Sequence, residues 1–342
     1  EKSHFTQPEE VDEFVGKNIL YTAHTIAETA AHCGRSEEEV KEVLAVAREK
    51  LTQARAGRPR PHLDDKILCA WNGLMLSALA KGYQVTGNRA YLQAAQCSAD
   101  FVLTTLYNPE QKMLLRRYRQ GEAGLAAHLD DYAFLVQGLL DLYEASFAIT
   151  YLQKAIELTR RQIELFADKA GGGFFETTDQ DATLLLRMKG DYDGAEPAAN
   201  SVAAVNLLRL APFVKENFRQ QARQTIDAFA AQLNRYPTAM PLMLAALDFY
   251  QHKPAQIIIA GHPEKPDTRA MLATVHAILL PYTTLLLADG GEGQQFLGKK
   301  IPSIAGLAPL NGRACAHVCR DLACSLPTTD IEELVKMLRA GG

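Results

Sequence analysis

The sequence predicts a mainly helical fold, an α/α toroid of helical hairpins, followed by a small α/β domain. Two observations carry this prediction. Helices that are apolar on nearly every side alternate with helices that carry a single apolar stripe, and short all-apolar strands follow Pro254. A ring of hairpins requires this alternation, because its inner helices are covered all round whereas its outer helices face water.

The alternation predicts about four hairpins. An amphipathic helix precedes them, with a capping-box signature at Ser36 and Glu39 and an end near Gly57. A closed toroid usually takes about six hairpins, so the ring is either open or completed by upstream residues. The apolar helices are expected at 65–83, 132–143, 197–210 and 241–249, and the amphipathic ones at 88–106, 151–166 and 218–233.

Strand-like segments occur in two places. Inside the helical part, Lys112–Arg119 and Gly173–Lys189 each run through Leu-Leu-Arg into a loop, which predicts β-hairpin insertions near 107–127 and 172–190. After Pro254, apolar strands around a helix at 268–280 predict a small parallel α/β unit. We therefore expect a toroid domain over 1–252 and an α/β domain over 253–342.

Composition excludes several classes of partner. The chain has 36 basic and 40 acidic residues spread along its 342 positions, a net charge of −4, so it has no stripe that would bind nucleic acid or anionic lipid. No run reaches the roughly 18 apolar residues of a membrane span. Six cysteines are too sparse for a disulfide framework, which favours a reducing cytoplasm and a soluble protein. The chain opens at Glu1, so an N-terminal targeting segment could be missing.

Two similar acidic segments precede successive apolar helices. His62-Leu63-Asp64-Asp65 stands before the first and His128-Leu129-Asp130-Asp131 before the second, 66 residues later, and an acidic segment ending at Glu196 stands before the third. Inner helices of a toroid point the same ends at one mouth, so we expect these carboxylates to converge there. Paired carboxylates with nearby aromatic side chains are typical of a carbohydrate site.

Structural roles compete with these interpretations. An Asp at a helix start caps free N–H groups, and Glu196 stands before a proline that suits a first helical turn. The two histidines could be loop hydrogen-bonders, and Trp71 lies in a helix whose pattern favours the core. Arg116, Arg117 and Arg187 could reach the mouth or form surface ion pairs.

The cysteines near the C-terminus do not form a metal motif. Cys315, Cys319 and Cys324 have a spacing that fits no compact zinc template, and His317 lies between the first two. We expect no metal and no cofactor, and we interpret Cys315 and Cys319 as buried thiols on a strand.

Several longer motifs stand at 59–66 with 71–74, 129–135 with 137–145, 171–175, 192–194 and 200–204. Together they resemble the spermatogenesis-associated protein 20 family and its bacterial thioredoxin-domain relatives. The resemblance covers nearly the whole chain. It implies a thioredoxin-like domain upstream of this segment and a six-hairpin toroid similar to those of glycosidases and of N-acylglucosamine 2-epimerase. No thioredoxin Cys-x-x-Cys is present in these residues.

Two functions remain open from the sequence. The first is a carbohydrate-active enzyme, a glycoside hydrolase or sugar epimerase, in which Asp65, Asp131 and Glu196 are the catalytic candidates. The second is a non-catalytic ligand- or protein-binding scaffold that serves a fused thioredoxin-like domain. The residues expected to hold a sugar or sugar-derived molecule are His62, Asp64, Trp71, Asn72, His128, Asp130, Tyr132, Asp193 and Asn200.

Overall fold

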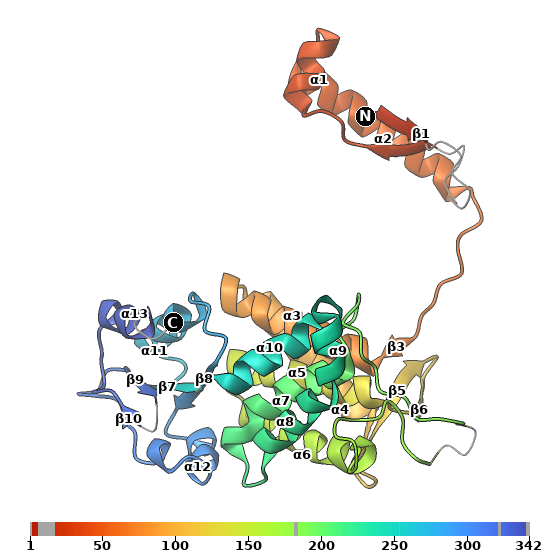
Figure 1. Ribbon diagram of the computed structural model, residues 1–342. Coiled ribbons are helices and arrows are strands. Elements are labelled where there is room, and N and C mark those ends of the chain that lie inside the picture. The colour runs from red at the N-terminus through yellow and green to blue at the C-terminus, as the bar shows by residue number, and fades with distance from the viewer. Residues whose placement is uncertain (1, 6–17, 181–183, 253, 321–322, 340–342) are drawn as a thin grey trace. The chain divides into compact units, whose positions relative to one another are not determined.

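The computed structural model describes residues 2–5, 18–180, 184–252, 254–320 and 323–339. The chain forms two compact units, unit 1 (Glu1–Asp64) and unit 2 (Asp65–Gly342), which Figure 1 labels by their helices and strands. No helix among the described residues has the length and apolarity that crossing a membrane requires.

Unit 1 is a pair of helices and a two-stranded sheet. Strands β1 (Lys2–Phe5) and β2 (Asn18–Tyr21) pair antiparallel. Helices α1 (Ile26–Cys33) and α2 (Glu37–Ala56) follow. The capping box predicted at Ser36 is present, because its hydroxyl accepts the Glu39 N–H and the Glu39 carboxylate accepts the Ser36 N–H.

The helical part of unit 2 consists of hairpins in which buried and amphipathic helices alternate. Helix α5 is buried on nearly every side, whereas α6 and α8 each bury one stripe. The predicted fold class, mainly helical hairpins with a small α/β part, is therefore confirmed (Figure 1). The helices are α3 (Cys69–Thr86), α4 (Arg89–Thr105), α5 (Leu129–Ser146), α6 (Ile149–Phe166), α7 (Ala199–Leu210), α8 (Phe218–Ala228), α9 (Ala230–Arg235) and α10 (Pro241–Gln251), with 3-10 turns η1 (Ala211–Phe213) and η2 (Pro237–Ala239).

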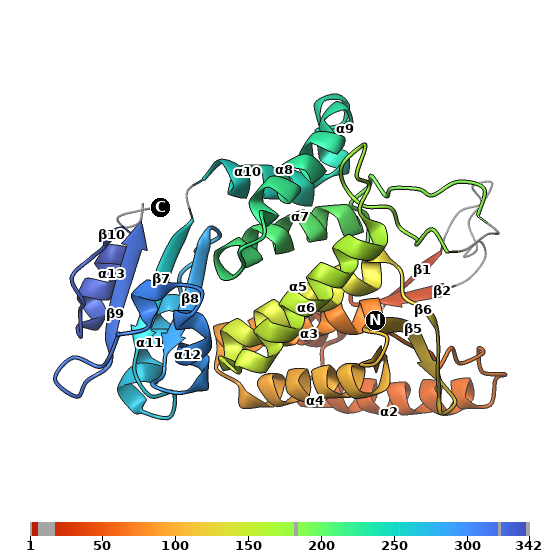
Figure 2. The same ribbon diagram turned by 90° about the horizontal axis from the view of Figure 1, so that it is seen from below.

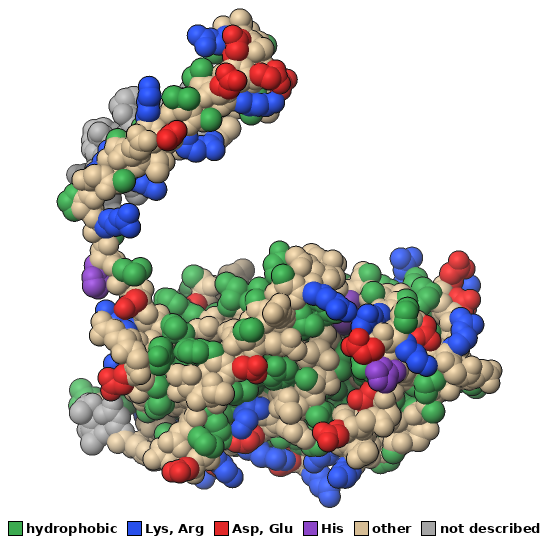
Figure 3. All heavy atoms as spheres, turned by 180° about the vertical axis from the view of Figure 1, so that it is seen from behind, with side chains coloured by type: hydrophobic (Ala, Val, Ile, Leu, Met, Phe, Trp, Pro, Cys, Tyr) green, Lys and Arg blue, Asp and Glu red, His purple; other side chains and the backbone are tan. Residues whose placement is uncertain are grey.

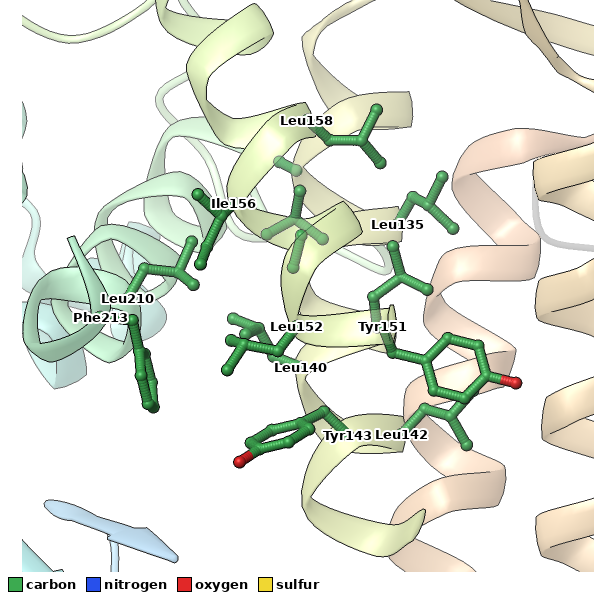
Figure 4. Close-up of a cluster of buried hydrophobic side chains, with 14 of the residues drawn as sticks. Leu135, Leu140, Leu142, Tyr143, Tyr151, Leu152, Ile156, Leu158, Leu210 and Phe213 are labelled. Atoms are coloured by element: carbon green, nitrogen blue, oxygen red, sulfur yellow. The ribbon is translucent and has the colours of Figure 1, made fainter. Parts of the chain in front are cut away.

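The main core is a cluster of buried side chains from α3, α4, α5, α6 and the end of α7, continued by residues of the C-terminal sheet. Figure 4 shows part of this cluster, with Leu135 and Leu140 from α5 and Leu152 and Ile156 from α6. Leu210, where α7 ends, closes this cluster. Burial of a leucine or isoleucine side chain contributes about 1.5–3 kcal/mol, so this cluster holds the second hairpin against the third.

Helix α3 departs from the expectation that it is covered all round. In unit 2, Trp71, Met75 and Val85 on one side of α3 are exposed. They recur at helical spacing, so they form a stripe rather than scattered positions. Figure 3 shows a face of unit 2 on which hydrophobic side chains gather. The sequence pattern indicates that this side of α3 is apolar, but it does not indicate whether another element covers it.

Helices α3 and α5 meet backbone to backbone. A Cβ on Gly73 would lie 2.5 Å from the Leu135 nitrogen, and a Cβ on Gly138 would lie 2.5 Å from the Gly73 carbonyl oxygen. The two glycines occupy similar places in their helices, offset by one residue: Gly73 lies in Trp71–Leu74 and Gly138 lies in Val136–Leu139. Only a residue without a side chain fits such a crossing. Helix α7 joins from the other side, where the Asn206 amide donates to the Ala133 carbonyl at 2.8 Å.

The first predicted insertion is a small sheet at one end of these helices. Its order is β3 (Ile67–Leu68), β5 (Met113–Arg119) and β4 (Tyr107–Asn108), with β6 (Glu122–Ala126) also paired to β5. Every pairing is antiparallel. Strand β3 directly precedes α3, so the sheet is tied to the start of that helix. Figure 2 shows β5 and β6 projecting beyond the helices.

The second predicted insertion, near 172–190, forms no named strand in its described part, and residues 181–183 lie outside the described residues. Side chains hold this loop in place of a strand ladder. Lys189 pairs with Asp168 at 2.7 Å, and the Arg187 guanidinium donates to the Thr177 carbonyl and lies over the Phe175 ring. Arg187 and Lys189, which the sequence pattern placed at the end of a strand, therefore hold the loop in position.

The C-terminal part contains a mixed sheet instead of a purely parallel one. The strand order is β10-β9-β7-β8, in which β7 and β8 are parallel and β9 runs antiparallel to β7. Helices α11 and α13 bury one face of the sheet. The elements are β7 (Ala255–Ala260), α11 (Pro266–His276), β8 (Thr283–Ala288), α12 (Glu292–Gly298), η3 (Pro302–Ile304), β9 (Cys315–Arg320), β10 (Ala323–Cys324) and α13 (Ile331–Arg339).

The thiol interpretation of the C-terminal cysteines needs a correction. Cys319 and Cys324 form a disulfide, because β10 folds back on β9 and sets the two residues directly opposite each other. Cys315 is a free, buried thiol. Among the described residues, no three His, Cys, Asp or Glu side chains gather as a metal site would require.

The boundary at 252 stays a prediction. Both sides of it lie in unit 2, and they are in contact: the His252 ring stacks on Tyr282 at 4.4 Å between centroids, and Phe249 lies 5.7 Å from the same ring. Helix α10 is thus packed against the start of β8.

The glycine crossing gives a stability prediction. Gly73→Ala is expected to lower the free energy of unfolding by about 1–3 kcal/mol or more, since its methyl group would overlap the α5 backbone. Gly306→Ala is the matched control, because a Cβ there meets nothing within 4 Å. Denaturant unfolding followed by circular dichroism would measure both, and equal unfolding midpoints would contradict a backbone-to-backbone crossing.

Candidate functional site

Four of the acidic residues predicted at one mouth lie at or before the N-terminal ends of α3, α5 and α7, and each is bound to a side chain of α3 or β5. We call this set the acidic mouth and define it by Asp65, Asp130, Asp131 and Glu196 with the side chains bound to them, Trp71, Arg116 and Arg119. Their linkage depends on the α3–α5 crossing and on the pairing of β3 with β5.

Asp131 is the buried centre of this set. Its side chain has no exposed surface, and both its oxygens have partners: Oδ1 accepts the Ala70 N–H at 3.0 Å, and Oδ2 accepts the His128 N–H at 2.9 Å. Arg116 donates to Oδ2 at 2.8 Å. The carboxylate thus caps α5 and ties its start to the start of α3. Burial, together with the charge of Asp130, raises the pKa of Asp131, against the effect of Arg116.

Arg116 joins the two adjacent acids. Its guanidinium binds Asp130 through two hydrogen bonds of 2.9 and 3.1 Å while it also binds Asp131. Such a forked pair fixes the planes of both groups. Arg116 and Asp130 are each just over one quarter exposed, at 28% and 27%. This pair therefore lies where a ligand can touch it, whereas Asp131 lies beneath it.

Two further carboxylates are exposed. Glu196 accepts a hydrogen bond of 2.7 Å from the indole N–H of Trp71, whose side chain is 53% exposed. Asp65 pairs with Arg119, and both side chains keep more than a third of their surface open, at 41% and 36%. The sequence favoured a core position for Trp71, and the structure instead holds its ring at the surface on a carboxylate.

Several predicted ligand-binding residues are built into the frame of the site. The fully buried Tyr132 accepts the Leu114 N–H at 3.0 Å through its hydroxyl oxygen. The Asn72 amide donates to the Leu68 carbonyl at 2.8 Å. Asn200 both accepts from the Phe174 N–H and donates to its carbonyl, at 2.8 and 2.9 Å. The polar groups of these three side chains are therefore hydrogen-bonded to the protein backbone.

Asp193 is a double cap. One oxygen accepts the Ala198 N–H at 2.7 Å and the other accepts the Leu242 N–H at 2.8 Å, which is in the first turn of α10. Both of its oxygens are engaged by backbone N–H groups.

The remaining predicted residues are the histidines and Asp64. His128 is partly buried, and burial and the nearby Arg116 lower its pKa, so it is neutral at pH 7. His62 and Asp64 belong to unit 1, where both are exposed.

The structure also holds a charged cluster that sequence reasoning missed, near the C-terminal ends of the same helices. Asp141 and Glu144 of α5 meet Arg209 of α7, at 2.9 and 3.2 Å, and Lys81 of α3, at 3.2 and 3.7 Å. One signal could have found it. A charged residue inside a helix that is covered all round must have a partner of opposite charge on a neighbouring helix.

Comparison with known proteins identifies the relatives of the chain. Spermatogenesis-associated protein 20 from Homo sapiens is 40% identical over 336 residues, which are 95% of this chain and 43% of that protein, and the Mus musculus protein is 39% identical. The chain is a homologue of spermatogenesis-associated protein 20. An uncharacterized Caenorhabditis elegans protein is 34% identical over 338 residues. The chain spans less than half the length of these curated relatives. No protein-family model matches it.

Solved structures share only a distant likeness. A cellobiose 2-epimerase from Bacillus thermoamylovorans is 12% identical, with 82% of this chain and 77% of that chain covered and a TM-score of 0.44. A family 76 α-mannanase from Bacteroides thetaiotaomicron is 16% identical, with 64% and 59% covered and a TM-score of 0.44. Similarity at this level carries no argument about the reaction.

The contacts of Asp131 give a second prediction. Asp131→Asn is expected to lower the free energy of unfolding by about 1–3 kcal/mol. The reason is that the amide nitrogen of Asn cannot accept the hydrogen bonds that one carboxylate oxygen of Asp131 now accepts. Asp130→Asn is the control, since that side chain is partly exposed and lacks the two backbone partners. Thermal or urea unfolding would compare the two, and an equal loss in both variants would contradict the central role of Asp131.

Proposed function

We propose that the acidic mouth binds a sugar or a sugar-derived small molecule, and that this part of the protein is a carbohydrate-active module of the hydrolase or epimerase type. One observation carries the proposal: the exposed Trp71 ring is held by Glu196 at the end of the helix pair that also presents the Arg116–Asp130 fork. An aromatic face stacks on a sugar ring, while carboxylates and guanidinium groups bind its hydroxyls.

The exposed carboxylates are the acid and base candidates. Glu196 and Asp65 are open to a ligand, and each is held by a neutral or basic side chain rather than by backbone N–H groups. Asp131 has no access to solvent, so in this proposal it positions Arg116 and does not exchange protons with the ligand. A hydrolase needs its two carboxyl groups about 5–9.5 Å apart across the bound sugar.

A non-catalytic role is the second candidate. Asp131 and Asp193 have both oxygens engaged by backbone N–H groups or by Arg116, which is what a structural carboxylate requires. This observation favours a scaffold that binds a ligand or polypeptide. In the longer relatives such a scaffold would serve the thioredoxin-like domain that the family resemblance implies.

The single tryptophan of the chain provides a direct test of binding. A sugar that stacks on Trp71 is expected to change the position or intensity of its fluorescence in a saturable way. A ligand at 100 times its dissociation constant should also add about 2.7 kcal/mol of stability. A panel of neutral sugars and sugar phosphates would be titrated into the 342-residue chain. If no member changes the fluorescence or raises the Tm, the proposal fails.

Paired substitutions separate the two candidate functions once a ligand is found. If the module is an enzyme, Asp65→Asn or Glu196→Gln is expected to lower turnover on the order of 100-fold or more without a change in Tm. Asp227→Asn is the matched control, because Asp227 forms a similarly exposed ion pair with Arg223. Binding that persists in both mouth variants, with no turnover in the unmodified chain either, would support the scaffold.

A further inference from the structure

A cavity lies near the C-terminal ends of the inner helices, and its lining includes no residue of the acidic mouth. Its volume is about 730 Å³, and it opens between the C-terminal halves of α3, α5 and α7, helix α10, and the segment from the end of α11 to β8. We call it the distal cavity. We propose that it binds an uncharged, largely apolar small molecule with a hydrogen-bonding head group, such as a long-chain alcohol. This site is distinct from the acidic mouth and independent of its function.

The floor of the distal cavity is the ion network of Asp141, Glu144, Lys81 and Arg209. Asp141 is almost completely buried, with 3% of its side chain exposed, and it accepts a further hydrogen bond from Ser77. Arg209 is 17% exposed and bridges both acids. Lys81 is 51% exposed and lies at the longer distances of 3.2 and 3.7 Å. Lys81 is therefore the most accessible of the four groups, and the Glu144 carboxylate beside it, at 18%, is about as exposed as Arg209.

The charges of this floor sum to zero. Two carboxylates face two cations, so an ionised ligand would bring an uncompensated charge into a partly buried site. A neutral head group avoids that cost. A hydroxyl group can accept from Lys81 and donate to Glu144 at the same time. His276, which also lines the cavity, does not alter the balance, because burial and then Lys81 lower its pKa to about 4.

The walls of the cavity are apolar. Leu242 and Phe249 come from α10, and Val275, Leu280 and Leu285 come from the opposite side. At the rim, Val85 and Leu279 are 78% and 89% exposed. Both are large aliphatic side chains at the edge of a cavity that is big enough for a drug-sized molecule. Apolar walls with a few converging polar groups are typical of a small-molecule site.

The test compares three ten-carbon ligands whose head groups are neutral, anionic and cationic. Decanol, decanoate and decylamine would be titrated into the 342-residue chain, with Tm and calorimetric heat as readouts. Decanol is expected to raise the Tm and to bind at least about tenfold more tightly than either ion. Trp71 fluorescence should stay constant, because that side chain belongs to the acidic mouth. No binding of decanol, or equal binding of all three ligands, would overturn the proposal.

Two variants localise the effect. Leu279→Arg should weaken decanol binding about tenfold or more, whereas Leu326→Arg should leave it unchanged, and both leucines are 89% exposed. Lys81→Met removes one cation, so the floor becomes negative and the preference should pass from decanol to decylamine. If the two arginine variants behave alike, or if Lys81→Met leaves the preference unchanged, the ligand does not bind on this floor.

Discussion

The close approach of α3 and α5 at Gly73 and Gly138 is the constraint on which the rest of unit 2 depends. It sets the separation of two inner helices along their whole length. At one end, this separation brings the Ala70 N–H to the Asp131 carboxylate. At the other end, it brings Ser77 and Lys81 to Asp141. Both candidate binding sites therefore depend on a backbone-to-backbone contact that only glycine permits at these two positions.

The helical part of the fold could be predicted because its signals are local and repeated. Hydrophobic periodicity separates a helix covered all round from one that faces water, and the pair Ser36 and Glu39 marks a helix start by itself. The sheet of the C-terminal part could be predicted only partly from the sequence. Strand β9 runs antiparallel to β7 after a long connection from β8, and the Cys319–Cys324 disulfide joins residues that the pairing of β10 with β9 sets opposite each other.

The candidate site shows where sequence similarity stops being informative. The two His-Leu-Asp-Asp segments have the same residues, yet Asp65 is exposed on Arg119 and Asp131 is buried on Arg116. The difference arises from β5, which supplies both arginines, and from the α3 backbone. The distal cavity could not have been predicted either, because its walls come from five elements that are distant in sequence. Only the charged residues Asp141 and Glu144 in a covered helix pointed toward it.

The double cap of Asp193 has a consequence for how this architecture can change. Proteins built of repeated hairpins commonly gain or lose repeats through duplication and deletion. Here the single carboxylate of Asp193 links the start of α7 to the start of α10, where Leu242 lies 49 positions after Asp193. Deletion of the intervening α8 and α9 would have to keep both backbone donors within reach of that one carboxylate. The third hairpin is therefore tied to the start of α10 and is not an independent, interchangeable module.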